Sequence, residues 1–122
     1  MYVITKLVAE SIRKRREEAG EERVYRYGLF RDTTRNGSVV HYIKAISEIR
    51  REGQLVDEDV AVSPGLGSTS QVAVKVFEMI AETVEPLSPI HLADVVRDMG
   101  VAAGSFAYSD SAAVAGAGDT VP

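Results

Sequence analysis

The sequence predicts a mainly α protein: a small helical domain of about four helices, with an αα-hairpin over residues 70–100 and an extended C-terminal arm. Two observations predict this class. Apolar residues recur at helical spacing in four separate segments. A glycine or a proline follows each of these segments, at the point where a helix would have to stop.

The composition is that of one globular domain. The chain has 122 residues, of which 45% are hydrophobic and 26% charged, enough apolar material for a single core. We therefore expect one helical domain over residues 1–100 and a C-terminal arm over residues 101–122 that is rich in small residues. The absence of cysteine excludes disulfides, thiolate metal sites and thiol catalysis.

The first predicted helix covers residues 3–19. Gly20 follows it as a stop, and its apolar residues lie three or four positions apart. These residues are Ile4, Leu7, Val8 and Ile12. The second half of the segment, residues 13–18, has no apolar residue, so we expect it to protrude into solvent or to meet a polar partner.

Residues 23–37 are ambiguous between strand and helix. Residues 24–30 are rich in strand formers, and Asn36 with Gly37 is a strong turn signal, so a hairpin with residues 39–42 is one interpretation. We favour a helix after the turn, because Ser38 can cap its start, Gly53 can end it and its apolar residues share one helical face. Those residues are Val39, Tyr42, Ile43, Ile46 and Ile49.

Residues 54–69 are predicted to be a connection. Residues 60–62 could form a short strand within it, and residues 63–70 have the composition of a loop. Two helices follow, over residues 71–84 and 88–99.

Local signals bound these two helices. Ser70 and Ser88 can cap their starts, Pro89 suits a first helical position, and Gly100 can close the second helix. Pro86 prevents the first helix from continuing, so the two helices are expected to form the αα-hairpin.

The arm over residues 101–122 contains Ala, Gly and Ser with scattered apolar residues and little charge. Such a segment needs a partner to become ordered. We expect Phe106, Tyr108 and Val114 to be assembly contacts that are buried against an adjacent subunit.

Charge is divided sharply along the chain. Residues 1–53 hold twelve Lys and Arg against eight Asp and Glu, whereas residues 54–122 hold two against ten. The first part therefore has a net charge of +4 and the second of −8, within a total of −4. This division predicts either a nucleic-acid face on the first part or contact between oppositely charged surfaces of neighbouring subunits.

A basic and aromatic set carries the predicted nucleic-acid contacts. Arginine and lysine neutralise phosphates, and aromatic rings stack on bases. The alternative interpretation is a solvated, salt-bridged run at residues 13–18 and aromatic rings that pack in the core over residues 23–35. The predicted contacts are Arg13, Lys14, Arg16, Arg23, Tyr25, Arg26, Tyr27, Arg31 and Arg35.

No motif assembles a catalytic or metal site. His41 and His91 stand far apart with no second ligand at metal spacing, and the carboxylates of residues 57–59 lie in a polar connection. The glycines of residues 64–70 precede a predicted helix, but the lysine of a phosphate-binding Walker loop is missing, and whether this loop binds a phosphate stays open. We expect no enzyme, no cofactor and no metal.

Neither a membrane span nor a secretory signal is predicted. No segment approaches the ~18 apolar residues that a membrane helix requires. The basic run at residues 13–16 follows the short apolar start, the reverse of the order in a secretory signal. We expect an intracellular or virion-associated protein.

The leading hypothesis is a non-enzymatic structural subunit that assembles with copies of itself. It would package DNA or RNA through its basic N-terminal half, as in a virion or nucleoprotein filament. The alternative is a small helix-turn-helix DNA-binding regulator built on residues 70–100. Its recognition helix would have to come from residues 102–114, which contain no Lys or Arg to donate hydrogen bonds to DNA.

Overall fold

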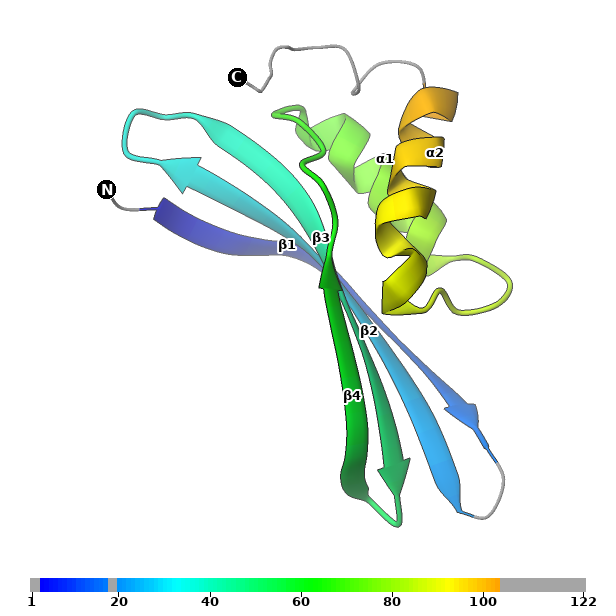
Figure 1. Cartoon of the computed structure of the whole chain (residues 1–122). Coiled ribbons are helices and arrows are strands. Elements are labelled where there is room, and N and C mark those ends of the chain that lie inside the picture. Colours follow the sequence, from blue (N-terminus) through cyan, green and yellow to red (C-terminus); the bar gives the residue numbers. More distant parts are fainter. Residues whose placement is uncertain (1–2, 18–19, 104–122) are drawn as a thin grey trace.

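The structure is a computed structural model that describes residues 3–17 and 20–103. Its first half is one antiparallel sheet whose strands follow in chain order: β1 (Val3–Arg16), β2 (Glu21–Thr34), β3 (Val39–Arg51) and β4 (Gln54–Val62). Three helical elements then pack on one face of this sheet (Figure 1): α1 (Ser70–Ala81), the 3-10 turn η1 (Pro89–His91) and α2 (Leu92–Ala103).

The predicted mainly α class is therefore wrong, and the protein is mainly β. β1 stands where a helix over residues 3–19 was predicted, and β3 stands where a helix was predicted after the turn. The connection predicted over residues 54–69 contains β4. The hairpin interpretation of residues 23–42 is the right one, because β2 and β3 pair across Asn36 and Gly37.

Apolar residues on both faces of β1, together with a β-bulge, explain why its sequence has helical spacing. Leu7 lies opposite Phe30 and Ala9 lies opposite Leu29, so Val8 is an extra residue in β1. Such an extra residue shifts the alternation of side chains by one position. Leu7 and Ile12 therefore share one face although they are five positions apart, whereas Val8 packs against the core on the other face.

The sequence of β3 has the apolar spacing of a helix because the strand is apolar on both faces. Ile43 is buried under the helices, whereas Tyr42 and Ile46 point to the opposite face, where they lie beside Phe30 and Arg26 of β2. Apolar residues on both faces of one strand remove the simple alternation that identifies a half-buried strand.

Two tight turns connect the later strands. Arg35, Asn36 and Gly37 form a three-residue turn, in which Gly37 has a φ of 90°. Glu52 and Gly53 form a two-residue turn between β3 and β4, and both have a positive φ, as the type I′ turn of a hairpin requires.

The two predicted C-terminal helices are present with shifted ends. Thr69, and not Ser70, is the N-cap of α1, which ends at Ala81. Ser88 is the N-cap of η1, which begins at Pro89 as predicted. The backbone of α2 continues through Gly100 to Ala103, so the predicted stop at Gly100 is wrong. Most of the predicted arm, with Phe106, Tyr108 and Val114, lies outside the described residues.

One core joins the sheet to the helices. Tyr27, Leu29 and Ile43 from β2 and β3 are at most 1% exposed, and they pack in one cluster with the buried faces of α1 and α2. The helical residues in this cluster are Ala73, Val76, Phe77, Ile80, Leu92 and Val96. We call the face of the sheet that packs on the helices the covered face, and the opposite face the open face.

The sheet is longer than the helical layer that covers it. In Figure 1 the β1–β2 and β3–β4 hairpins extend past the helices at one end, and the β2–β3 turn extends past them at the other end. The helices therefore cover only the middle of one face, and the open face carries no element that the structure describes.

Candidate functional site

Apolar side chains form two rows across the open face. Residues that lie directly opposite one another in an antiparallel sheet share a face, so the register defines these rows. One row contains Leu7, Phe30 and Tyr42, in which the two aromatic rings stack with their centroids 5.5 Å apart. The other row contains the apolar residues Ile12, Ile46 and Val60, with the charged Arg26 between Ile12 and Ile46.

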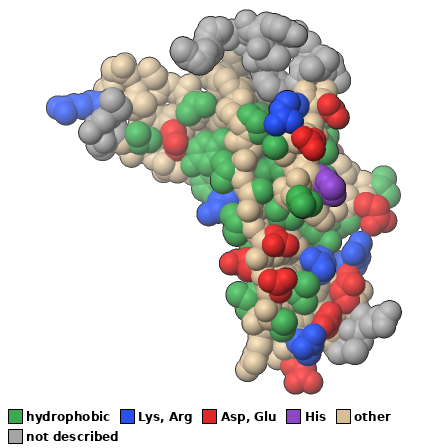
Figure 2. Space-filling view, in the orientation of Figure 1, with side chains coloured by type: hydrophobic (Ala, Val, Ile, Leu, Met, Phe, Trp, Pro, Cys, Tyr) green, Lys and Arg blue, Asp and Glu red, His purple; other side chains and the backbone are tan. Residues whose placement is uncertain are grey.

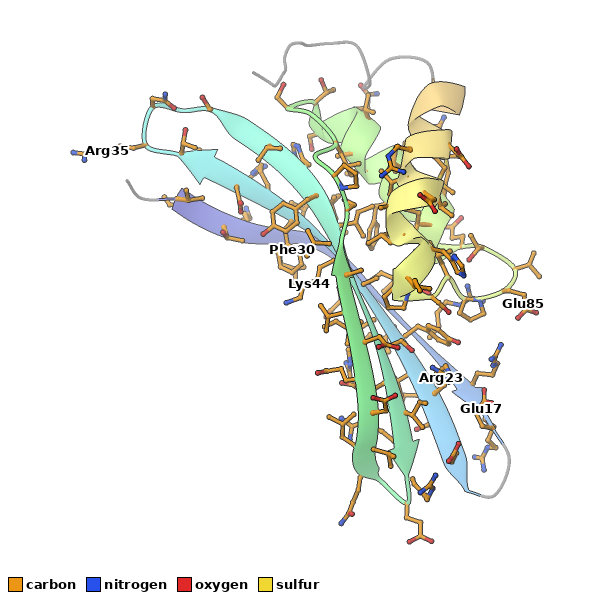
Figure 3. The ribbon with its side chains drawn as sticks, in the orientation of Figure 1. Glu17, Arg23, Phe30, Arg35, Lys44 and Glu85 are labelled. Atoms are coloured by element: carbon orange, nitrogen blue, oxygen red, sulfur yellow. The ribbon has the colours of Figure 1, made fainter. Side chains whose placement is uncertain are left out.

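These rows remain accessible to solvent. Leu7 and Ile12 are each 46% exposed, and Val60 is 51% exposed. Figure 3 shows Phe30 and Lys44 pointing to the side of the sheet away from the helices. Clustered apolar side chains at this degree of exposure are typical of a protein interface.

The two edge strands carry opposite charges. β1 contains five basic residues and one acidic residue, Glu10. β4 contains three acidic residues and no basic residue. The basic set is Lys6, Arg13, Lys14, Arg15 and Arg16, and the acidic set is Asp57, Glu58 and Asp59. We call the first set with its strand the basic edge and the second the acidic edge.

Both edges have backbone groups available for pairing. Within residues 3–17 and 20–103, β1 pairs only with β2, and β4 pairs only with β3. Neither strand contains proline, which would remove a donor from the edge. An edge strand with free N–H and C=O groups is a template on which another strand can pair.

Several charges of the central strands form ion pairs with one another. Glu48 of β3 is largely buried. It forms ion pairs with Arg26, at 3.6 Å, and with Arg50, at 3.1 Å. Arg51 pairs with Glu21 across the β2–β3 ladder. Acidic and basic residues are therefore mixed in the middle of the sheet. At its two edges the two kinds of charge remain separate. Figure 2 shows the acidic side chains that lie over β4 at the front of the molecule.

Arg13 and Arg15 of the basic edge turn toward the helical layer. Arg13 donates hydrogen bonds to the carbonyl oxygens of Ala81 and Thr83, which lie at and just after the C-terminus of α1. Arg15 forms ion pairs with Glu17 at 2.9 Å and with Glu85 at 3.2 Å. Both carboxylates raise the pKa of Arg15, and the hydrogen bond that Arg15 donates to Glu17 is the largest cause. Figure 3 shows Glu17 and Glu85 on the side of the helices.

The structure separates the residues that were predicted to contact nucleic acid. Tyr25 and Tyr27 lie in the core, at 3% and 1% exposure, as in the alternative interpretation of aromatic packing. The hydroxyl of Tyr27 donates to the carbonyl of Leu87 at 2.8 Å, and burial raises its pKa to about 12. The hydroxyl of Ser47 accepts a hydrogen bond from Arg23 at 3.1 Å.

The remaining predicted cations lie in two places. Lys14 and Arg16 are exposed at one end of the basic edge. Arg31 and Arg35 lie near the β2–β3 turn at the opposite end of the sheet, where Figure 3 shows Arg35 extending into solvent. They do not form one continuous basic surface with Lys14 and Arg16.

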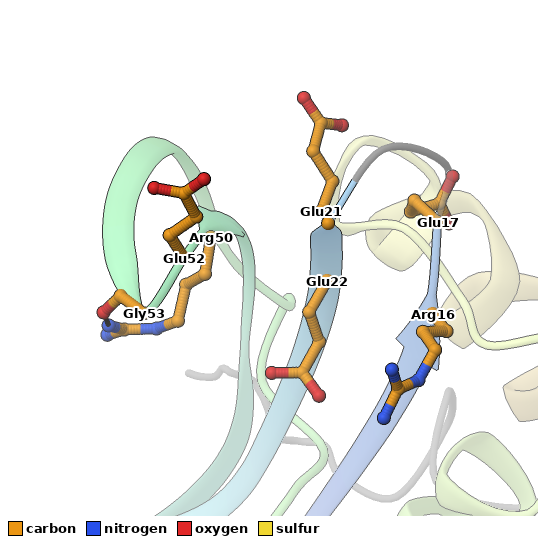
Figure 4. Close-up of a pocket in the computed structure, with 8 residues that line it drawn as sticks. Arg16, Glu17, Glu21, Glu22, Arg50, Glu52 and Gly53 are labelled. Atoms are coloured by element: carbon orange, nitrogen blue, oxygen red, sulfur yellow. Dashed lines mark hydrogen bonds between the residues drawn. The ribbon is translucent and has the colours of Figure 1, made fainter.

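A shallow depression of about 250 Å³ lies between the tips of the β1–β2 and β3–β4 hairpins (Figure 4). Its lining contains four carboxylates and two arginines and no serine, cysteine or histidine. The lining residues are Arg16, Glu17, Gly20, Glu21, Glu22, Arg50, Glu52 and Gly53. Exposed charges without a nucleophile or an oriented base do not form a catalytic arrangement.

The glycine-containing loop after β4 pairs with β3. The amide of Leu66 donates to the carbonyl of His41 at 2.7 Å, and the amide of His41 donates to the carbonyl of Gly67 at 3.0 Å. The loop therefore extends the ladder of β3, which gives it a structural role. Phosphate binding at this loop stays untested.

His41 is fully buried beside this loop. Its Nδ1 lies 3.0 Å from the carbonyl of Gly67, and its Nε2 is buried without a hydrogen-bond partner. Burial lowers the pKa of His41 below its ordinary 6.5, and the nearby Arg31 lowers it further. At this buried position a neutral imidazole is more stable than a charged one.

Sequence reasoning missed the acidic edge and the exposed partners Ile12 and Val60. Residues 57–59 were assigned to a polar connection, although they lie in β4. One signal could have found this strand: residues 52 and 53 separate two segments rich in β-branched residues, which is the spacing of a two-residue hairpin.

Comparisons with protein-family models, with curated proteins and with solved structures gave no match to this chain. Within residues 3–17 and 20–103, no group of three or more His, Asp and Glu side chains could hold a metal ion. In the same part of the chain, no helix has both the length and the apolar character that a membrane span needs.

Proposed function

We propose that this protein is a non-enzymatic structural subunit that assembles with copies of itself. The observation that carries the proposal is the long sheet with one uncovered face. Its apolar rows, which contain Leu7, Ile12 and Val60, are about half exposed in the single chain. Burying one such side chain completely is worth ~1.5–3 kcal/mol, so a few of them contribute substantially to an interface.

Sedimentation velocity over a series of protein concentrations tests this proposal. We expect the weight-average sedimentation coefficient to rise with concentration, because association depends on mass action. A protein that sediments as a monomer at every concentration and salt condition would contradict it.

A matched pair of variants locates the interface. Val60→Ser removes an apolar side chain from the open face, where Val60 is 51% exposed. Val84→Ser removes one from the connection between α1 and η1, where Val84 is 92% exposed. Assembly through the open face predicts that Val60→Ser weakens association and that Val84→Ser does not.

The proposal includes packaging of DNA or RNA by the basic N-terminal half. Among the predicted contacts, Lys14 and Arg16 at one end of the basic edge and Arg35 at the opposite end of the sheet are the exposed cations. Binding through them predicts an affinity for DNA or RNA that falls by ~0.9 log units per phosphate contact per log unit of salt. Fluorescence anisotropy that detects no binding at low salt removes this part and leaves self-assembly standing.

The alternative function, a helix-turn-helix DNA-binding regulator, has less support. Between Ser70 and Ala103 the only basic residues are Lys75 and Arg97, and Arg97 pairs with Asp94 at 2.8 Å. The apolar faces of α1 and α2 pack on the sheet. This alternative also predicts DNA binding, so fluorescence anisotropy that detects no binding at low salt would contradict it.

A further inference from the structure

We propose that copies of this chain join edge to edge, with the basic edge of one copy pairing as a strand with the acidic edge of the next. This inference rests on the proposed self-assembly, names a second copy as the partner, and adds a contact at the strand edges to the one proposed through the open face. The first argument is charge. β1 carries a net charge of +4 and β4 a net charge of −3, so unlike edges attract and like edges repel.

The strand directions allow this pairing. The four strands alternate in direction along the sheet, so β4 runs opposite to β1. When a second copy is placed beside the first with the same orientation, its β1 is therefore antiparallel to β4 of the first copy. The sheet then continues across the contact, and the helices of both copies stay on the same face.

The register within one copy predicts the register between copies. One row of directly opposed residues runs through Lys14, Val24, Glu48 and Glu58. Continuing this row without stagger places Glu58 of one copy opposite Lys14 of the next. Both side chains lie on the open face, where directly opposed unlike charges stabilise a strand pair.

The neighbouring rows agree with the same register. The row through Arg13 ends at Asp59, and the row through Arg15 ends at Asp57. Each therefore brings an arginine of one copy opposite an aspartate of the next, on the covered face. The row through Ile12 ends at Val60, so it brings two half-exposed apolar residues together on the open face.

Backbone hydrogen bonding also agrees with this register. Along a row of antiparallel strands, hydrogen-bonded and non-hydrogen-bonded pairs alternate, because the N–H and C=O of one residue point to the same side. Along one row, the four strands of a copy form three residue pairs, and the contact with the next copy forms a fourth. Because four is an even number, the alternation continues without a break into the first pair of the next copy. Because each copy uses one edge of each kind, the contact is head to tail and produces a ring or a filament.

Two charge-reversal variants test this inference. The basic-β4 variant carries Asp57→Lys, Glu58→Lys and Asp59→Lys, and the acidic-β1 variant carries Lys14→Glu, Arg15→Glu and Arg16→Glu. All six side chains are exposed, and the ion pairs that Arg15 would lose are surface pairs that contribute little to stability. Both variants should therefore keep the fold, which circular dichroism checks. In each variant the two edges carry charge of the same sign.

We expect each variant alone to associate at least about tenfold more weakly than the natural chain, because like charges then face one another. An equimolar mixture should recover association, since each edge of one variant is complementary to an edge of the other. Sedimentation velocity of the two variants and of their mixture measures this directly.

Other outcomes overturn the inference in distinguishable ways. Variants that associate as strongly as the natural chain would exclude the edge contact and leave assembly through another surface. Monomeric natural chain would exclude both the edge contact and the proposed function. If the triple variants fold poorly, Glu58→Lys and Lys14→Glu alone provide the same test, with a smaller loss in each and recovery in their mixture.

Discussion

The two faces of the sheet contain similar apolar residues with very different surroundings. On the covered face, Leu29 and Ile43 are 0% exposed beneath the helices. On the open face, Leu7 and Ile12 are each 46% exposed. The chain therefore completes its core with one face and leaves the other face exposed, and this is the face through which we propose that it assembles.

The largest expected difference between the faces is in their contribution to folding. Leu29→Ala creates a cavity under the helices and should lower the free energy of unfolding by ~2–5 kcal/mol. Ile12→Ala on the open face should lower it by less than ~1 kcal/mol. Urea unfolding of both variants measures this, and equal losses would contradict the distinction between the faces.

The next contrast uses two neighbouring cations whose side chains lie on opposite faces. Arg13→Met removes hydrogen bonds from a guanidinium to carbonyls at the end of α1, which should lower the unfolding free energy by ~1.5–3 kcal/mol. Lys14→Met, on the open face, should change it by less than ~0.5 kcal/mol. The same urea experiment applies, and a larger loss in Lys14→Met would show that the faces are assigned wrongly.

A smaller contrast compares two tyrosines. Tyr27→Phe removes the buried hydrogen bond to the carbonyl of Leu87 and should cost ~0.5–1.5 kcal/mol. Tyr42→Phe, on the open face, removes a hydroxyl that lies 3.4 Å from the carboxylate of Asp32, and it should cost less than ~0.5 kcal/mol. Thermal unfolding measures both losses of stability, and a larger loss in Tyr42→Phe would contradict the difference between the two faces.

The smallest expected effect is a pH dependence from His41 on the covered face. Its pKa in the folded protein lies below the ordinary 6.5 of the unfolded chain, so the unfolded chain binds more protons between these two values. Stability from this group is therefore complete above pH 6.5 and is lost as the pH falls through 6.5 toward the folded pKa. His41→Gln should reduce this slope in urea unfolding, and an unchanged slope would contradict the assignment to His41.

The sequence predicted elements well where one face alone is apolar. In α1, buried Ala73, Val76, Phe77 and Ile80 recur at helical spacing because only one side of the helix meets the core. In β1 and β3 the same spacing comes from apolar residues on both faces, and in β1 a bulge at Val8 also shifts the alternation. Local periodicity does not distinguish these cases, because pairing with distant strands decides them.

The candidate site could be predicted only in part. The division of charge along the chain was visible in the sequence, and the structure places its two extremes on the two edges of the sheet. Which residues face one another depends on the register of all four strands, and no local pattern contains that information. The aromatic residues Tyr25 and Tyr27 were predicted as surface contacts, but they lie in the core.

An engineered disulfide tests the edge contact most directly, because the chain contains no cysteine. Ile12→Cys with Val60→Cys places one thiol on each edge, and within one copy three strand spacings, on the order of 14 Å, separate them. This is too far for a disulfide, which requires Cα atoms within ~7 Å. Between copies the two thiols would lie directly opposite.

Mild oxidation followed by non-reducing electrophoresis should therefore produce a ladder of covalent oligomers from this double variant. The control Ser11→Cys with Val60→Cys places the two thiols on opposite faces, and it should produce much less. Monomer alone after oxidation of the Ile12→Cys, Val60→Cys chain, or equal ladders from both variants, would contradict the pairing of the basic edge with the acidic edge.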